Sequence, residues 1–375
     1  MSQSQQMRYK KMKSTREQTI LRIIKRPTQE ALLGLIRNEE YHNDIKRLAG
    51  EVRDRSYGHR VYLRGLIEIS SYCKNNCYYC GIRSANANAL RYRLNREQIL
   101  GCCRTGASLG FSTFVLQGGE DPWYTDERLC GIIRSIKAEY PGCAVTLSLG
   151  ERSGESYRLL YEAGADRYLL RHETATPAHY ARLHPPALSL RNRMQCLTSL
   201  KEIGYQTGAG FMVGSPCQSL EHLAADLKYI SELAPQMVGI GPFLPHHESP
   251  FADFASDPSM ATEVQDPLNM TILMVALTRL LLPYALIPAT TALATLSPQG
   301  REKALDAGAN VIMPNLSPED VRGAYLLYDN KASFGTEAAE SLEKNRQALE
   351  KSGYIMDMSR GDYKQNDIEA CLKPE

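Results

Sequence analysis

The sequence predicts an α/β fold in which eight parallel strands and their crossover helices close into a complete (β/α)8 (TIM) barrel. From Val61 onward, short β-rich runs alternate with longer amphipathic stretches, and this alternation favours a parallel sheet with right-handed crossovers. The alternating region covers about 270 residues, close to the roughly 250 of a complete barrel. An open doubly wound sheet is the alternative, but no GxGxxG sequence follows the first strand. The expected strands are Val61–Ile69, Thr113–Gln117, Ala144–Leu149, Arg167–Arg171, Gln206–Val213, Met237–Phe243, Ala285–Thr290 and Asn310–Met313.

The chain divides into three predicted parts. Residues 1–57 should form a helical N-terminal extension packed on the barrel, with a capping box at Ser14-x-x-Glu17. Residues 58–328 should form the barrel itself, in which several helices end at a glycine directly before the next strand. Residues 329–375 are charged and weakly apolar, so we expect a loosely packed C-terminal appendage with one helix from about Thr336 to Lys351.

Composition excludes several classes of protein. The 375 residues are 43% hydrophobic and 23% charged, with a net charge of only +2, so nothing favours a nucleic-acid or membrane partner. The apolar stretch Thr271–Ile287 contains Arg279 and Pro283 and is shorter than the ~20 residues a membrane helix needs. No apolar leader segment opens the chain, and the cysteines are scattered singly except for one closely spaced group of three and the neighbours Cys102 and Cys103, so we expect a reducing cytoplasm rather than a disulfide framework.

Three cysteines stand out because they are closely spaced just after the first predicted strand. Cys73, Cys77 and Cys80 have the spacing Cys-x3-Cys-x2-Cys. Thiolates this close in sequence suit a soft metal or an iron–sulfur cluster. A structural zinc site usually has a fourth protein ligand, and no second Cys or His pair follows. A cluster held by three thiolates leaves one iron open for a ligand that is not protein.

Polar residues also collect at the ends of the other predicted strands, where the chemistry of a parallel barrel is found. The second strand ends in Gln117-Gly118-Gly119-Glu120, where two glycines permit close backbone approach and a carboxylate can bind an ammonium group. A tight turn alone would also explain these glycines. Thr146 of the third strand shares its face with Ser148, and we expect this face to line the inside of the barrel.

Charged residues at the end of the fourth strand indicate a polar ligand or a buried ion pair. Arg171 and Glu173 share one face of the chain, and charged residues rarely enter a barrel core unpaired. Arg193 could supply a cation for a carboxylate. Thr290 and Thr291 end the seventh strand, where they could bind an anionic ligand or cap the following helix. The adjacent His246 and His247 receive no role.

The cysteine motif, with the aromatic Tyr79 before its last cysteine, resembles the signature of the radical S-adenosylmethionine (radical SAM) superfamily. Further matches in chain order resemble one branch of it, the HydE family of FeFe-hydrogenase maturases, over about residues 14–328. The matching strings are SSYCKNNCYYCGIR, FVLQGGEDPWY, VTLSLGE, GADRYLLRHETATP, GYQTGAGFMVG, MVGIGPFLPH, MVALTRLLLP, IPATTA and GANVIMPN.

The resemblance implies an enzyme with a barrel of the radical SAM type and two cofactors. These are one 4Fe–4S cluster on Cys73, Cys77 and Cys80, and S-adenosylmethionine (SAM) bound to the open iron. Reductive cleavage of SAM to a 5′-deoxyadenosyl radical would then serve assembly of the hydrogenase active site, acting on a small sulfur- and iron-containing precursor. The implied partners are other maturation proteins and an electron donor.

The resemblance also implies roles for individual residues. Tyr79 would lie by the adenine, Gly118, Gly119 and Glu120 by the amino group, and Glu173 and Arg193 by the rest of SAM. The polar substrate cavity would be lined by Gln117, Thr146, Arg171, Thr290 and Thr291, with either Tyr325 or Tyr328.

One departure from some relatives predicts a single cluster. Those relatives carry a second cluster on three cysteines near the C-terminus, whereas Cys371 is the only cysteine after Cys217 here. Two alternatives stay within the superfamily: a methylornithine synthase-like or a biotin synthase-like enzyme, although no ligands for the second cluster of a biotin synthase are evident. A non-catalytic cluster-carrying scaffold is the alternative from another class.

Overall fold

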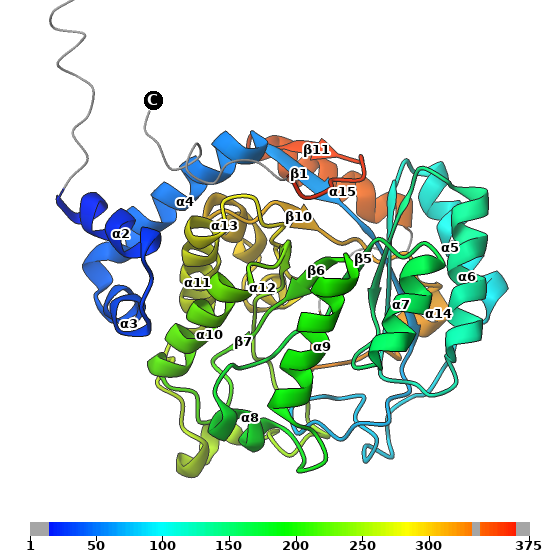
Figure 1. Cartoon of the computed structure of the whole chain (residues 1–375), viewed down its shortest axis with the longest axis horizontal. Helices are drawn as coiled ribbons and strands as arrows, with labels where there is room; N and C mark the ends of the chain where they lie inside the picture. The colour runs from blue at the N-terminus through cyan, green and yellow to red at the C-terminus, as the bar shows by residue number, and fades with distance from the viewer. Residues whose placement is uncertain (1–14, 332–337, 365–375) are drawn as a thin grey trace, which may run out of the picture.

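A ring of parallel strands surrounded by helices forms the centre of the protein (Figure 1). The computed structural model describes residues 15–331 and 338–364. The strands of the ring are β1 (Arg60–Leu63), β2 (Gly65–Ser70), β3 (Thr113–Gly118), β4 (Ala144–Ser148), β5 (Arg167–Leu169), β6 (Gln206–Ala209), β7 (Met212–Val213), β8 (Met237–Val238), β9 (Gly241–Pro242) and β10 (Val311–Ile312).

Strand pairing joins all eight predicted segments in chain order. One parallel sheet runs β2-β3-β4-β5-β6-β8, and β10 pairs in parallel with β1, which leads directly into β2. Leu286 bridges Met237 on one side, and Pro288 bridges Val311 on the other, so the pairing returns to its start. The predicted α/β fold with parallel strands is therefore confirmed.

Three of the predicted strands are less regular than expected. The seventh segment, Ala285–Thr290, joins only through isolated bridges, in part because Pro288 has no N–H to donate. The fifth and sixth are each broken in two, near Gly210 and Gly239. Gly210 has φ of 156°, and a Cβ there would lie 2.0 Å from the carbonyl oxygen of Gly239, so the two segments approach closely only because Gly210 lacks a side chain.

Helices cover the outside of the ring. They are α2 (Thr15–Lys25), α3 (Gln29–Arg37), α4 (His42–Tyr57), α5 (Arg96–Ser108), α6 (Asp126–Glu139), α7 (Gly154–Glu162), α8 (Pro177–Leu183), α9 (Leu190–Ile203), α10 (Leu220–Leu233), α11 (Pro267–Leu281), α12 (Thr291–Leu296), α13 (Gly300–Asp306), α14 (Glu319–Arg322) and α15 (Ala338–Lys351), with short 3-10 turns at Glu39–Tyr41, Phe254–Ser256 and Pro258–Met260.

The N-terminal helices pack on the barrel helices. Helix α3 lies against α10, and α4 lies against α11. The predicted capping box begins at Ser14, which is outside the described residues. Helix α11 accounts for most of the apolar stretch Thr271–Ile287, and its residues from Thr271 to Leu280 are all buried. Within residues 15–331 and 338–364, no helix is long and apolar enough to span a bilayer.

The described C-terminal residues are not a loosely packed appendage, contrary to the sequence prediction. Strand β11 (Ile355–Asp357) pairs in parallel with the free edge of β1. In Figure 1, β11 and α15 lie at the top, and the long loop after β2 lies at the bottom, at the opposite end of the barrel. The polar composition of this segment concealed both its strand pairing and the packing of Leu349 and Tyr354 on the hydrophobic core.

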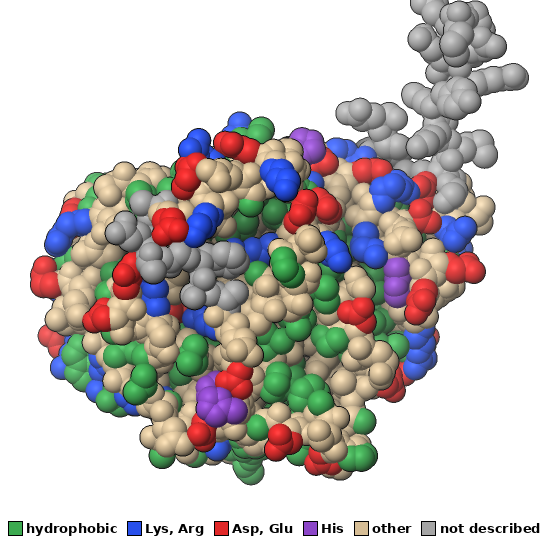
Figure 2. All heavy atoms as spheres, turned by 180° about the vertical axis from the view of Figure 1, so that it is seen from behind, with side chains coloured by type: hydrophobic (Ala, Val, Ile, Leu, Met, Phe, Trp, Pro, Cys, Tyr) green, Lys and Arg blue, Asp and Glu red, His purple; other side chains and the backbone are tan. Residues whose placement is uncertain are grey.

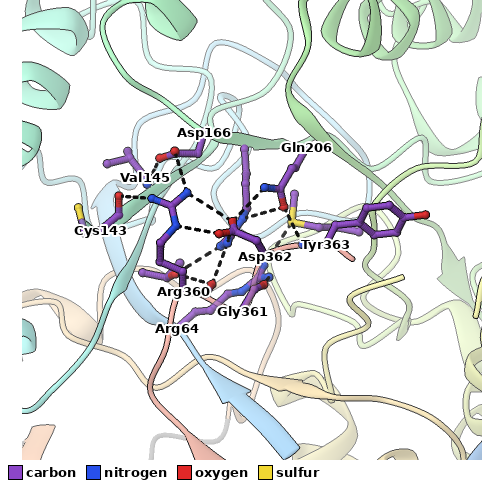
Figure 3. Close-up of polar contacts among 12 residues, drawn as sticks. Arg64, Cys143, Val145, Asp166, Gln206, Arg360, Gly361, Asp362 and Tyr363 are labelled. Atoms are coloured by element: carbon purple, nitrogen blue, oxygen red, sulfur yellow. Dashed lines mark hydrogen bonds and ion pairs between the residues drawn. The ribbon is translucent and has the colours of Figure 1, made fainter. Parts of the chain in front are cut away.

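Residues 360–362 close the end of the barrel opposite the cysteine loop, where they contact the first residues of β3, β5 and β6, and Figure 3 shows their polar contacts. The Asp362 carboxylate accepts hydrogen bonds from Arg167 (2.6 Å) and from Gln206 (2.9 Å). Thr113 and Arg167 also donate to the carbonyl of Arg360. Burial alone would raise the pKa of Asp362, but hydrogen bonds from Arg360 and Gln206 and the charge of Arg167 outweigh it and hold this pKa well below its usual range.

We predict that Asp362→Ala lowers the free energy of unfolding by about 2 kcal/mol, because it leaves the fully buried Arg167 without its carboxylate. The loss should be smaller than the roughly 3–5 kcal/mol of a fully buried pair, since the Asp362 side chain is 39% exposed. Denaturant unfolding of the apoprotein measures it, with Glu343→Ala in an exposed ion pair as a neutral control. The difference should shrink below about pH 4, where the carboxylate of the unfolded chain becomes protonated.

Candidate functional site: the cysteine loop and the barrel mouth

Asp121 ties both ends of the cysteine loop to the turn after β3. Ser70, at the end of β2, donates its hydroxyl to Asp121 (2.7 Å). Arg93, at the far end of the loop, makes two hydrogen bonds to the same carboxylate (2.7 and 3.0 Å), and it pairs with Ser70 in an antiparallel bridge. Burial would raise the pKa of Asp121, but the bonds from Arg93 and Ser70 lower it, so the group stays ionised. The loop of residues 71–92 is thus fixed at both ends by one carboxylate.

Gly119 of the Gly118-Gly119-Glu120 turn lets the cysteine loop approach this turn closely. A Cβ on Gly119 would lie 2.2 Å from the carbonyl oxygen of Tyr72 and 2.7 Å from the Cβ of Cys73. The backbone of Lys74 donates to the carbonyl of Glu120 (2.9 Å). The glycine therefore serves a close backbone approach beneath the cysteines, and not only a turn.

The three thiols fit an iron–sulfur cluster better than a single ion. Cys73, Cys77 and Cys80 are half-buried free thiols in one loop. Among the described residues, one group of three possible metal ligands has all its ligand atoms within 4.8 Å of one another, and it consists of His246, His247 and Asp329. The sulfur atoms of the three cysteines do not meet this distance, so they stand too far apart to surround one ion.

These thiols would need a positively charged partner to lose their protons. Burial, reinforced by the neighbouring Cys73, raises the pKa of the Cys77 thiol to about 12, and burial raises the pKa of Cys73 and Cys80 as well. Cationic iron would stabilise the thiolates in this half-buried loop.

Tyr79 lies next to the thiols and contacts the loop around α8. Its hydroxyl is 3.2 Å from Nε2 of His184, and the two rings meet edge to face. Burial and the neighbouring charges of Cys77 and Glu173 raise the pKa of Tyr79, which keeps the phenol neutral. Tyr79, Cys77 and Glu173 therefore lie in one electrostatic neighbourhood.

The two proposed SAM-binding groups at the barrel mouth already have protein partners. The Glu120 carboxylate accepts from the backbone of Glu151 (2.8 Å) and lies 3.3 Å from the Lys74 ammonium. Arg193 donates to Glu151 (2.5 Å) and to the carbonyl of Arg171 (2.6 Å). Glu151 thus links both groups. The sequence reasoning missed it, although it directly follows the third strand.

The predicted cavity residues contain polar atoms that lack a protein partner. Arg171 and Glu173 form an ion pair at 3.0 Å, but Nε and Nη2 of Arg171 and Oε2 of Glu173 are buried without an aligned hydrogen bond. The hydroxyls of Thr146 and Thr290 are likewise buried and unpaired. Thr290 precedes α12 but makes no side-chain cap, so the capping interpretation is wrong for it. Buried polar atoms without partners are costly, and a polar ligand would satisfy them.

The remaining cavity candidates are hydrogen-bonded within the protein. Thr291 accepts from Arg301 (3.2 Å), and Gln117 donates to the hydroxyl of Tyr325 (3.4 Å). Of the two tyrosine candidates, Tyr325 is therefore the one that contacts a predicted cavity residue. Tyr325 is buried, whereas Tyr328 is half-buried.

A buried ion pair near Gln117 escaped the sequence reasoning altogether. Glu68 of β2 is only 1% exposed, and its carboxylate accepts from Lys331 (2.5 Å) and Asn315 (2.9 Å). Glu68 and Gln117 are register partners on β2 and β3. An acidic residue within the otherwise apolar run Gly65–Ile69 was the available signal for Glu68, whereas nothing in the sequence pointed to Lys331.

Comparison with known proteins assigns the chain to a family. A family model described as the radical SAM superfamily matches residues 67–230. The chain is 47% identical over 296 residues to the "[FeFe] hydrogenase maturase subunit HydE" of Thermotoga maritima, covering 79% of this chain and 82% of that protein. The chain belongs to the HydE family of radical SAM enzymes. Enzymes of this superfamily use a 4Fe–4S cluster and SAM, and the Cys-x3-Cys-x2-Cys loop fits that cofactor pair.

More distant similarities support the same fold. The chain is 30% identical to the 3-methylornithine synthase of Methanosarcina acetivorans over 301 residues, covering 80% of this chain and 81% of that one. A crystal structure of methylornithine synthase (PylB) superposes with a TM-score of 0.75 at 26% identity, covering 94% of this chain and all of that one. The chain therefore shares its architecture with methylornithine synthase.

We predict that Cys77→Ser abolishes the cluster while leaving the fold intact, since the loop is held at its ends by Asp121 and not by the thiols. Iron analysis and visible absorbance after anaerobic reconstitution should fall to background, whereas the native chain should bind four irons. Cys196→Ser, in a buried helix position away from the loop, is the matched control and should keep the native iron content. About eight irons per native chain would contradict the single-cluster prediction.

Proposed function

We propose that this chain is a FeFe-hydrogenase maturase that cleaves SAM reductively and uses the radical on a small, sulfur- and iron-containing precursor of the hydrogenase active site. The observation that carries the proposal is a set of buried polar groups, the hydroxyls of Thr146 and Thr290, which lack a hydrogen bond, and the Arg171–Glu173 ion pair, in a barrel whose cysteine loop fits a cluster. The 47% identity to a protein named as HydE supports the choice of pathway.

The residues of the chain would divide the work between the two cofactors and the substrate. Cys73, Cys77 and Cys80 would hold the cluster, which when bound supplies the electron that cleaves SAM to methionine and a 5′-deoxyadenosyl radical. Tyr79, Gly118, Gly119, Glu120, Glu173 and Arg193 would bind and orient SAM. Glu151 donates its backbone N–H to Glu120 and accepts from Arg193 through its carboxylate. We therefore expect the Glu120 and Arg193 side chains to be oriented before SAM binds.

The substrate would bind deeper in the barrel, and the wall there is suited to an anion. Arg171 offers unpaired N–H groups, and Thr146 and Thr290 offer hydroxyls. Two glycines of the sixth segment face these groups. A Cβ on Gly241 would lie 3.4 Å from the hydroxyl of Thr290, and one on Gly239 would lie 3.8 Å from the Arg171 side chain. Because neither residue has a side chain, space is left beside Thr290 and Arg171. The end of the barrel opposite the cysteine loop is closed by residues 360–362, which helps to exclude water from a radical reaction.

We also infer a cytoplasmic protein with small-molecule and protein partners. The nine cysteines of the described residues are all free thiols. Basic and acidic side chains are interspersed on the face shown in Figure 2, which disfavours nucleic acid as a partner. The expected protein partners are other maturation factors and an electron donor.

The test is activation of an apo-hydrogenase by the anaerobically reconstituted protein with the other maturation proteins. Native protein should restore hydrogen evolution, and Cys77→Ser should not. Lysine consumption with SAM turnover would instead assign the chain to methylornithine synthesis. Absence of any 5′-deoxyadenosine after reduction would leave only the scaffold alternative.

A second variant tests the cavity separately from the cofactors. Thr290→Val removes one unpaired hydroxyl at nearly constant volume, and we expect about a tenfold loss of precursor affinity, the effect of one hydrogen bond to a charged group. SAM cleavage without precursor should stay native. Thr271→Val, a buried threonine of α11, is the control and should change neither quantity. Unchanged precursor affinity in Thr290→Val would remove Thr290 from the cavity.

A further inference from the structure

A buried histidine–aspartate pair lies directly behind the turn that carries Glu173. His172 and Asp226 have no exposed surface, and Asp226 reaches the turn from helix α10. Neither residue contributes to the cysteine loop or to the cavity wall. An aspartate at the centre of a barrel helix interface is rarely found unless it forms specific bonds.

The two residues connect the turn to both of its neighbours. Nε2 of His172 lies 3.3 Å from Oδ1 of Asp226, and Oδ1 also accepts the backbone N–H of Ala175 (2.5 Å). On its other side, Nδ1 of His172 accepts the backbone N–H of Gly210 (3.3 Å). Since Nδ1 is an acceptor, Nε2 carries the proton and donates to Asp226.

Packing fixes the imidazole in this position. Its ring meets Tyr229 edge to face with 4.9 Å between centroids, and Phe211 lies on another side at 5.9 Å. Burial lowers the pKa of His172 to about 3 and raises the pKa of Asp226, so burial disfavours the charged form of each group. The pair therefore acts on the site through geometry rather than through charge.

The turn needs such fixing because Glu173 adopts a left-handed backbone. Its φ is +65°, a conformation that costs a non-glycine residue about 1 kcal/mol or more. The Glu173 N–H donates to Gly210 (3.1 Å), and its carbonyl accepts from Met212 (3.2 Å), which holds the residue against the fifth segment. Asp226 bonds to His172, directly before Glu173, and to Ala175, two residues after it. Together these bonds determine a conformation that Glu173 would not adopt alone.

We propose that Asp226 and His172 are positioning residues of the SAM site: they fix residues 172–175 so that the Glu173 carboxylate faces the cofactor. The inference rests on the proposed role of Glu173 in SAM binding. If the turn relaxed, Glu173 would leave the left-handed region and its side chain would turn away from the site, with Arg171 losing its ion-pair partner.

The experiment measures the dissociation constant of SAM for the reconstituted full-length protein, together with iron content and melting temperature. Asp226→Ala, which cannot accept from His172 or Ala175, should weaken SAM binding roughly tenfold or more, as loss of a supporting partner typically does. Asp226→Asn keeps the acceptor oxygen and should stay close to the native affinity. All variants should retain four irons.

Two further variants separate positioning from general destabilisation. Leu227 lies next to Asp226 on the buried face of the same helix. Leu227→Ala should lower the melting temperature without changing SAM affinity. His172→Phe keeps the ring packing against Tyr229 and Phe211 but loses both hydrogen bonds, so it should repeat the effect of Asp226→Ala. It also provides the test if Asp226→Ala does not fold.

Glu173→Gln distinguishes this inference from the function on which it rests. If Glu173→Gln weakens SAM binding but Asp226→Ala and His172→Phe bind SAM natively, Glu173 keeps its role and the positioning inference is wrong. If Glu173→Gln itself binds SAM natively, its role in the cofactor site is wrong, and the inference falls with it. Equal weakening in Leu227→Ala would also overturn the inference, because the effect would then be one of stability alone.

Discussion

The cofactor end of this protein depends on one buried carboxylate, Asp121. It accepts the hydroxyl of Ser70 where the cysteine loop begins and the guanidinium of Arg93 where the loop ends. This double attachment joins the two ends of a loop of more than twenty residues and so limits the conformations open to the segment that carries the thiols. The same carboxylate accepts from the backbone of Trp123, which fixes the glycine turn beneath Cys73. One side chain thus sets the position of the cluster ligands and of the turn expected to hold the amino group of SAM.

Elsewhere in the site, side chains held by hydrogen bonds lie beside a few buried polar atoms that have no hydrogen-bond partner in the protein. Glu151 orients Arg193, and residues 172–175 are pinned from helix α10. Against this, Arg171, Thr146 and Thr290 keep buried polar atoms unpaired. A protein core normally avoids such atoms, so their presence among the predicted cavity residues supports a polar ligand there.

Local sequence patterns predicted the cluster motif, which depends on residue spacing, and the barrel fold, which depends on the alternation of strands and helices. Cys-x3-Cys-x2-Cys identifies its cofactor because three thiolates at that spacing have few other uses, and alternating strands and helices indicate a parallel barrel. Patterns could not predict contacts between distant segments. The pairing of Lys331 with Glu68, of Asp226 with His172, and of Asp362 with Arg167 joins residues far apart in the chain. For this reason the C-terminal segment, polar in sequence, was wrongly expected to be loosely packed.

The central claim is that the three cysteines hold a cluster with one iron open to SAM. Electron paramagnetic resonance of the reduced, reconstituted protein tests it most directly, with and without added SAM. The account predicts one reduced 4Fe–4S signal per chain whose g-values shift when SAM binds, and the same protein should form 5′-deoxyadenosine. A cluster signal that SAM leaves unchanged at saturating concentration would show that no iron is open to the cofactor, and would contradict the account.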